Sequence, residues 1–263
     1  MQLRGTHARM RAGSLLALLL TVDSAACTLR VGANAPHHRR AILCALTSGC
    51  LSQPAVAASS IAALYDAEAA TYDSAYSGSV VSRAMQFDKL RESVTSKASG
   101  EVLEVGIGTG LNLPFYKEFA ISSVVGIDVS MGMLEQAQRR LSVLPIGQRV
   151  QLKLADAATL PFDNDRFDTV VDTFSLCVFD DPAGVLAEAT RVLKPGGRLI
   201  VLEHDDSPVS RAMAFTRGTS SVASTCAYDQ DVQSLVREAG LSIRETSVAA
   251  GGFLRCVVAE KPF

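Results

Sequence analysis

Residues 102–110 read Val-Leu-Glu-Val-Gly-Ile-Gly-Thr-Gly, and residues 123–128 read Ser-Val-Val-Gly-Ile-Asp. The first run predicts a strand that enters a loop with glycines at alternate positions, where the backbone can turn sharply and approach a ligand closely. Asp128 comes 22 residues after Gly106, a spacing suited to a carboxylate that binds a ribose diol from the neighbouring strand. The two runs therefore predict a nucleotide-type site at the ends of two strands.

The glycine spacing differs from that of a dinucleotide site. A dinucleotide fingerprint has the form G-x-G-x-x-G, and its third glycine brings a helix close to the pyrophosphate. Here the third glycine, Gly110, comes one position early, and Leu111 stands where the fingerprint requires glycine. No Gly-Lys-Ser/Thr follows to bind phosphates. The pattern favours a nucleoside without phosphates over NAD or ATP.

The run VLEVGIGTGLNLPFY (residues 102–116) resembles the class I S-adenosylmethionine (SAM)-dependent methyltransferases with a type 11 domain. Residues 154–157, 167–174 and 191–197 resemble further motifs of that family in the same order. The resemblance covers roughly residues 62–262. It points toward the ubiquinone/menaquinone C-methyltransferases, the phosphatidylethanolamine N-methyltransferases and the thiol-methyltransferase-like proteins. It implies SAM as the cofactor and a small-molecule or lipid acceptor.

Alternating apolar runs and helical patterns predict an α/β fold with a seven-stranded, mostly parallel Rossmann-like sheet. Helices should cover both faces, and the C-terminal strands should form an antiparallel hairpin. The expected strands are 102–105, 124–127, 150–154, 169–173, 198–202, 241–248 and 253–260. Helical structure is expected over 61–99 and 112–119, and in helices capped by Ser130, Asp181 and Asp229.

The resemblance assigns cofactor residues at the ends of the expected strands, where open parallel sheets bind ligands. It implies that Glu104 orients the SAM ammonium, that Asp128 accepts hydrogen bonds from both ribose hydroxyls, and that Asp156 accepts from the adenine amine. The full expected set is Tyr72, Glu104, Gly106, Ile107, Gly108, Thr109, Gly110, Asp128, Val129, Asp156, Ala157, Thr173 and Phe174. Alternatives stay open for three of them, with Asp128 as a capping or turn residue, Asp156 as a turn residue and Tyr72 as a core residue.

His204 is the candidate catalytic residue. It follows the fifth expected strand, and the unperturbed pKa of histidine, about 6.5, suits proton transfer near neutrality. The cofactor itself carries the activated methyl group, so a base is needed only when the acceptor must lose a proton. Glu203 and Asp205 are weaker candidates, and a packing or loop role for His204 stays open. The segment 207–228, with Met213, Phe215 and Arg217, is long for a connection and suggests a lid or pocket wall.

The cysteines beyond residue 58 are Cys177, Cys226 and Cys256, which lie far apart in the sequence. The chain has no C-x-x-C pair and no Cys/His cluster in sequence. Neither a zinc site nor a disulfide framework is therefore indicated, and buried or free thiols are expected.

The first 58 residues resemble a targeting leader that is removed from the mature protein. They carry six arginines and one acid, a net charge of +5, whereas residues 59–263 carry 19 basic and 26 acidic residues, a net charge of −7. Two apolar runs, 15–22 and 41–51, each follow arginines, and Ala55-Val56-Ala57 forms an A-x-A cleavage site. The tandem signals resemble leaders for plastids bounded by extra membranes, and Arg39-Arg40 resembles a signal to the thylakoid. A mitochondrion and the endomembrane or secreted route are the alternatives.

The expected organisation is a leader (1–58), N-terminal helices that cap the cofactor and face the acceptor (59–100), and a methyltransferase core (101–263). The expected function is in-line methyl transfer from SAM to a small, apolar or lipid-like acceptor, with peripheral membrane contact. The acidic body argues against a nucleic-acid partner, because phosphate binding needs a basic face. A catalytically silent SAM-binding assembly protein is the alternative. An NAD(P)-dependent oxidoreductase is less consistent with Leu111 and the terminal hairpin.

Overall fold

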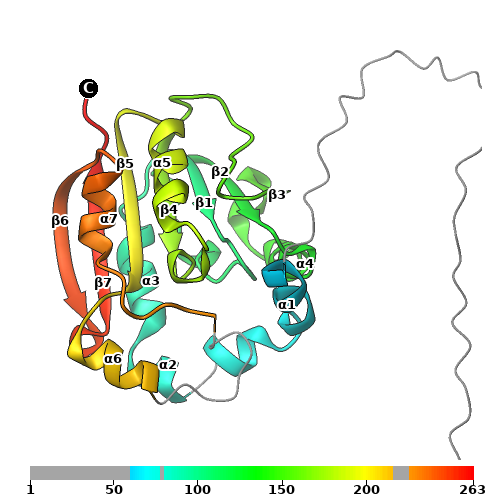
Figure 1. The fold of residues 1–263 in the computed structure, drawn as a ribbon. Coiled ribbons are helices and arrows are strands. Elements are labelled where there is room, and N and C mark those ends of the chain that lie inside the picture. The colour runs from blue at the N-terminus through cyan, green and yellow to red at the C-terminus, as the bar shows by residue number, and fades with distance from the viewer. Residues whose placement is uncertain (1–59, 78–79, 216–224) are drawn as a thin grey trace, which may run out of the picture. The chain divides into compact units, whose positions relative to one another are not determined.

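The computed structural model describes residues 60–77, 80–215 and 225–263 (Figure 1). All of them belong to one unit of the chain, residues 53–263. The leader expected over residues 1–58 and Arg217 lie outside the described residues. Within the described part of the chain, no helix combines the length and apolar character needed to cross a membrane.

A seven-stranded mixed sheet forms the centre of this unit, in the order β3-β2-β1-β4-β5-β7-β6. Strands β1 to β5 pair in parallel, and β7 pairs antiparallel with both β5 and β6. The strands are β1 Gly100–Val105, β2 Ile121–Asp128, β3 Val150–Leu154, β4 Phe167–Thr173, β5 Leu193–His204, β6 Ser242–Ala249 and β7 Leu254–Glu260. The expected α/β architecture, including the C-terminal antiparallel pair, is confirmed.

Helices cover both faces of the sheet, and each face has its own apolar core. Helices α5 (Pro182–Val192) and α7 (Val232–Glu238) pack on one face through residues such as Leu186 and Val236. Helices α3 (Phe87–Thr95) and α4 (Met131–Leu141) pack on the other through residues such as Val94 and Leu134. Burial of both faces explains why the central strands are almost continuously apolar.

Two of the expected helix caps are present. The Ser130 side chain accepts a hydrogen bond from the Met133 N–H, and the Asp181 side chain accepts one from the Gly184 N–H. Pro182 stands in the first turn of α5, where its missing N–H has no partner to lose. The third expected cap was placed two residues early, because Asp231 rather than Asp229 accepts from Ser234 at the start of α7.

The helical region before β1 is broken rather than continuous. It consists of α1 (Ser60–Glu68), a π-turn at Asp73–Ser77, α2 (Val80–Ala84) and α3. Gln86 has a φ of 55°, which ends α2 and redirects the chain into α3. The helix expected over 112–119 is wrong as well, since only a 3-10 turn forms at Leu113–Phe115. Helix α6 (Pro208–Phe215) forms in a segment for which no helix was expected.

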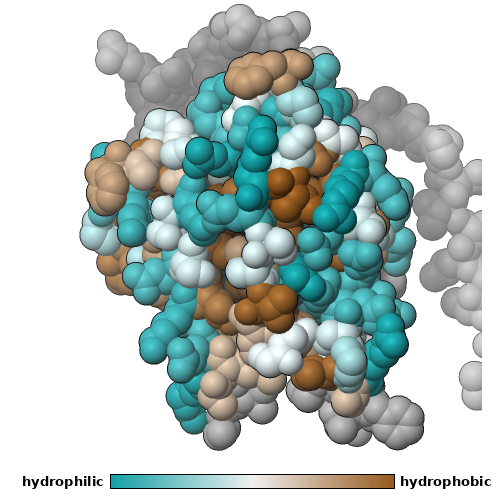
Figure 2. All heavy atoms as spheres, turned by 90° about the vertical axis from the view of Figure 1, so that its left-hand side faces the viewer, coloured by the Kyte–Doolittle hydropathy of each residue, from teal (hydrophilic) through white to brown (hydrophobic). Residues whose placement is uncertain are grey.

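One edge of the sheet is the strand β6, whose central residues are exposed. Figure 2, which views this edge, shows hydrophilic residues over most of it with separate hydrophobic patches between them. Arg244 and Glu245 stand on this edge and pair with Glu260 and Lys97 respectively. Charged side chains on an exposed edge discourage pairing with another strand.

Candidate cofactor site

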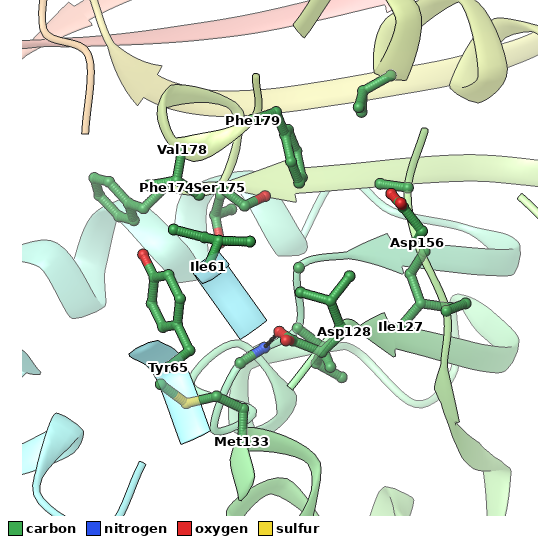
Figure 3. Close-up of a pocket in the computed structure, with 18 of the residues that line it drawn as sticks. Ile61, Tyr65, Ile127, Asp128, Met133, Asp156, Phe174, Ser175, Val178 and Phe179 are labelled. Carbon is green, nitrogen blue, oxygen red and sulfur yellow. Dashed lines mark hydrogen bonds between the residues drawn. The ribbon is translucent and has the colours of Figure 1, made fainter. Parts of the chain in front are cut away.

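A cavity of about 250 Å³ opens at the carboxyl ends of β1, β2, β3 and β4 (Figure 3). This is the edge at which open parallel sheets bind ligands. Eleven of the fourteen residues expected in the site line the cavity: Tyr72, Gly106, Ile107, Gly108, Thr109, Asp128, Val129, Asp156, Ala157, Thr173 and Phe174. Glu104, Gly110 and His204 do not. The lining residues that the sequence did not single out are mostly apolar, and many of them come from α1, α4 and the turn after β4.

The glycine loop needs glycine for two different reasons. Gly106 has a φ of 59°, and a Cβ added there would lie 2.5 Å from the Ser175 side chain. Gly108 has a φ of 55°, but a Cβ there would meet only the Gly106 carbonyl oxygen, at 3.9 Å. A side chain at position 106 would therefore clash with protein, whereas one at position 108 would project into open space beside the cavity. Gly108 is the position where the loop leaves room for a ligand.

Asp128 at the end of β2 is fixed by the main chain. One carboxylate oxygen accepts from the Gly108 N–H and the other from the Ser130 N–H, both at 2.9 Å. Burial raises the pKa of Asp128 to about 6, while the backbone donors oppose that rise. Figure 3 shows the carboxylate at the cavity beside Ile127. The same side chain thus orders the glycine loop and presents an acceptor to a ligand.

Asp156 and Ala157 follow β3 and form the next part of the wall. Asp156 is exposed, and its carboxylate accepts from the Ala158 N–H at 2.9 Å. In Figure 3, Asp156 lies on the side of the cavity away from Tyr65 and Phe174. Asp156 therefore stabilises the turn after β3, as the alternative interpretation proposed, and it also lines the cavity.

Arg91 is a site residue that the sequence analysis missed. It lies on α3, lines the cavity, and donates hydrogen bonds to Asn112 Oδ1 at 3.0 Å and Thr173 Oγ1 at 3.1 Å. Its guanidinium also lies 4.9 Å from the centre of the Phe174 ring. Arginines of amphipathic helices normally face solvent, so the sequence gives no sign that Arg91 faces the cavity. Only the packing of α3 against the sheet places it there.

Phe174 forms the end of the cavity beyond β4. Its φ of 60° is unusual for a residue with a large side chain, and such strain persists only where the surroundings enforce it. The ring packs against Phe87 at 5.1 Å between centroids and against His204 at 5.6 Å. Because these contacts fix the ring, Phe174 is a rigid wall of the site.

Glu104 belongs to a buried network behind the cavity. Its two carboxylate oxygens accept from Asn112 Nδ2 at 2.9 Å and from the Tyr116 hydroxyl at 2.8 Å. Burial raises the pKa of Glu104 to about 7. The prediction that Glu104 contacts the cofactor is therefore not confirmed, because its oxygens already have internal partners and it is absent from the lining. Through Asn112 it holds Thr173 and Arg91 in position.

Gly110 is a packing residue. A Cβ at that position would lie 2.5 Å from Leu113 and 3.4 Å from Ala137. It therefore lets the loop approach α4, and Leu111 faces the cavity instead.

The segment before β1 covers the cavity and is held by two carboxylates. Asp66 accepts from the Ser130 hydroxyl at 2.6 Å and the Gly132 N–H at 2.8 Å. Asp73 accepts from the Thr109 hydroxyl at 2.6 Å and pairs with Arg140. Tyr65 and Tyr72, each directly before one of these two anchors in the chain, line the cavity. Helix α1 and the segment that follows it therefore contribute part of the cavity wall.

His204 lies in a packed aromatic cluster and does not reach the cavity. Its ring packs 4.7 Å from both Tyr228 and Phe253, and its side chain is 12% exposed. Phe174, which touches both the cavity and His204, separates them. A role as general base toward a ligand in the cavity is not supported by this placement, because Phe174 would have to move first. The weaker candidates, Glu203 and Asp205, are buried and do not line the cavity either.

The segment 207–228 was expected to form a lid or pocket wall. None of its described residues, 207–215 and 225–228, lines the cavity. Within that segment, Cys226 forms a disulfide with Cys177, whereas Cys256 on β7 is free. The expectation of unpaired thiols is thus wrong for two cysteines. The two cysteines are 49 residues apart, so no local sequence pattern indicates that they pair.

Comparison with known proteins identifies the family of the chain. The methyltransferase domain family matches residues 103–201. The chain is 32% identical over 162 residues to phosphatidylethanolamine N-methyltransferase of Cereibacter sphaeroides, covering 59% of this chain and 79% of that protein. It is 34% identical over 160 residues to the ubiquinone/menaquinone biosynthesis C-methyltransferase of Desulfotalea psychrophila, covering 58% of this chain and 60% of that protein.

The fold has solved counterparts as well. A SAM-dependent methyltransferase from Thermotoga maritima superposes with a TM-score of 0.60 at 22% identity, over 76% of this chain and 99% of that one. This likeness shows the fold, and the sequence relatives define the class. The chain belongs to the SAM-dependent methyltransferases of the methyltransferase domain family, and SAM is its methyl donor.

Proposed function

We propose that this methyltransferase acts on a small apolar molecule, such as a quinone or a lipid. The observation that carries the proposal is the lining of the cavity on the side away from Asp156. Apolar side chains of Ile61, Met133 and Val178 surround that part, together with Tyr65 and Phe174, and Phe179 continues the apolar wall toward Asp156. Mostly apolar walls with few polar groups select apolar ligands. The two relatives described above, named for a phospholipid and for quinones, support the same class of acceptor.

The donor set of the cavity fits SAM. Asp128 supplies a half-buried carboxylate for the ribose diol, and Asp156 and Ala157 supply an acceptor and an N–H for adenine. Arg91 supplies a cation for the carboxylate of the methionine portion, and Gly108 leaves space for the ligand beside the loop. Charge-assisted hydrogen bonds of this kind are about twice as strong as neutral ones.

When bound, SAM supplies an activated methyl group, so the chain's own task is to align the acceptor and exclude water. Phe174 and Tyr65 would hold an apolar acceptor. The cover anchored by Asp66 and Asp73 would exclude water. None of the described lining residues is a histidine, so an acceptor that must lose a proton would depend on Asp128, Asp156, Asp180 or Asp181, or on solvent.

The test is incubation of the protein with methyl-labelled SAM and a lipid extract of the source organelle, followed by mass spectrometry. A labelled quinone or lipid is the expected product. Asp128→Asn should reduce labelling at least about tenfold through the lost charge-assisted bonds, whereas the exposed control Asp163→Asn should not. Labelling of only water-soluble products would contradict an apolar acceptor while leaving the methyltransferase assignment intact.

We also propose that residues 1–58 are a cleaved leader to a plastid, with thylakoid delivery as the narrower form, and that the mature protein touches membranes peripherally. The arginine-rich leader and the A-x-A site support this proposal, and so does the expected acceptor class. Sequencing the N-terminus of the protein purified from its source should find a start close to residue 58. Recovery of the full leader on the mature protein would contradict it.

A further inference from the structure

Four chemically active side chains meet on the far side of Phe174. They are Cys177 from the turn after β4, Glu203 and His204 at the end of β5, and Cys226 before α7; their donor atoms all lie within 4.8 Å of one another. We call them the Cys–His cluster. We propose that Cys177 and Cys226 form a redox-active disulfide, assisted by His204, that controls how tightly the cavity binds SAM.

The disulfide is joined directly to the wall of the cavity. Cys177 lies in a short 3-10 turn, Leu176–Val178. Its neighbours Ser175, Val178 and Phe179 line the cavity, and Cys177 itself is 3% exposed. Movement of this turn therefore changes the shape of the site.

On the other side, the disulfide secures a stretch that has no regular secondary structure. Residues 225–231 form neither helix nor strand. Apart from the disulfide, one backbone hydrogen bond ties the stretch to the turn, from the Ala227 N–H to the Cys177 carbonyl at 2.8 Å. Opening the disulfide would remove the covalent link to the turn, so that only non-covalent contacts would hold the stretch: the Ala227 hydrogen bond, the packing of Tyr228 on His204 and Phe253, and the bond from the Asp206 N–H to the Gln230 carbonyl. The redox state thus determines how firmly the wall is held.

The surroundings of Cys226 suit thiol chemistry. His204 Nδ1 lies 3.3 Å from Cys226 Sγ and 2.8 Å from Glu203 Oε1. An imidazole next to a thiol can take its proton, and the resulting imidazolium stabilises the thiolate. Glu203 is fully buried, and its carboxylate stabilises the imidazolium in turn. A disulfide with only a structural role does not need such a pair.

The reaction balances with an external disulfide, RSSR, as oxidant. The Cys226 thiol gives its proton to His204, and the thiolate attacks one sulfur of RSSR, releasing RS⁻. Cys177 then attacks Cys226 Sγ, expelling a second RS⁻ and forming the internal disulfide. The two protons from the cysteines end on the two released thiols. Thiol–disulfide exchange follows this mixed-disulfide route, and a dithiol donor reverses it.

A resident metal ion at the Cys–His cluster is the competing explanation. Two observations favour the redox role instead. The two sulfur atoms are bonded to each other, so they are not available as thiolate ligands. Both carboxylate oxygens of Glu203 already accept backbone N–H bonds, from Cys177 at 3.2 Å and from His204 at 2.7 Å.

The first test compares SAM binding by calorimetry before and after reduction of the wild-type protein with a dithiol. We expect reduction to weaken binding about fivefold or more, the size of typical coupling between sites. Cys256→Ser, which changes the free cysteine, should keep the full redox effect. Equal affinity in both states, or failure of the pair to oxidise in the presence of glutathione disulfide, would overturn the proposal.

The second test uses variants of the cluster. Cys226→Ser should bind SAM like the reduced wild type under both conditions. His204→Gln should slow oxidation by glutathione disulfide about tenfold or more, because the thiolate loses its partner, and should leave the final extent of oxidation unchanged. An unchanged rate in His204→Gln would overturn the role of the imidazole. One tightly held zinc ion per reduced chain, lost in both variants, would assign the cluster to a metal and overturn the redox proposal.

Discussion

The two halves of one sheet edge differ in what occupies them. The ends of β1 and β2 open into the cofactor cavity, whereas the end of β5, on the same edge, is closed by His204, Tyr228 and Phe253. Both ends carry polar residues that suggest chemistry in the sequence. The difference comes from neighbours: glycines leave space at the first end, and aromatic rings fill the second. A polar residue at a strand end is therefore functional only where its surroundings leave room.

The largest effect is expected from a substitution that fills the cofactor cavity at the ends of β1 and β2. Gly108→Arg should abolish SAM binding, a loss of about 100-fold or more, because a side chain there projects into the cavity and its positive φ is unfavourable for arginine. Calorimetry would measure the loss, and mass spectrometry should find the Cys177–Cys226 disulfide unchanged. Retained SAM binding would show that the cavity at Gly108 is not the cofactor site.

A second prediction concerns the buried carboxylate behind the open end. Burial raises the pKa of Glu104 to about 7, so the folded state binds this proton more tightly than the unfolded state does. The free energy of unfolding should therefore fall as pH rises from about 4.5 to 7, by on the order of 3 kcal/mol from this group. Urea denaturation at pH 5 and pH 8 would measure it. Burial also raises the pKa of Asp172 and Asp128, so Glu104→Gln should remove only its own share of the measured difference, and an unchanged slope would contradict the assignment.

Arg91 distinguishes a ligand-facing cation from one that only packs on Phe174. Arg91→Met keeps the length and apolar stem of the side chain but removes the charge. We expect SAM affinity to fall about tenfold, equivalent to about 1.4 kcal/mol, with the melting temperature shifted by only a few degrees. Lys89 lies on an exposed part of the same helix, and Lys89→Met serves as the matched control. A large loss of stability without loss of affinity would make Arg91 a structural residue.

The smallest effect is expected at the cover of the cavity. Asp66→Asn removes the charge from the two hydrogen bonds that hold α1 to the start of α4, at a cost of about 1 kcal/mol. Hydrogen exchange should increase in α1 and remain unchanged around His204, because the closed end does not depend on this anchor. Faster exchange both in α1 and around His204 would show that these two regions are coupled.

Most of the fold was predictable because hydrophobic periodicity records burial directly. The strands 150–154 and 169–173 correspond to β3 and to all but the first two residues of β4, and the caps at Ser130 and Asp181 follow from local hydrogen bonding. Asp229 was a wrong cap because Asp231 competes two residues later, and local sequence does not distinguish them. The helix expected at 112–119 did not form beyond Leu113–Phe115, since the backbone of Tyr116 is extended, with a φ of −65° and a ψ of 132°, and ends the turn.

The sequence by itself determined the parallel sheet, the glycine loop, Asp128 and the class of cofactor, because each depends on residues close together or at a fixed spacing. Only the tertiary structure decided that Arg91 faces the cavity, that Glu104 is buried behind it, and that His204 lies with Cys177 and Cys226 beyond Phe174. These relations join residues from different elements, separated by tens of positions. Chain packing brings them together, and no local pattern encodes which side chain will find space and which will be enclosed.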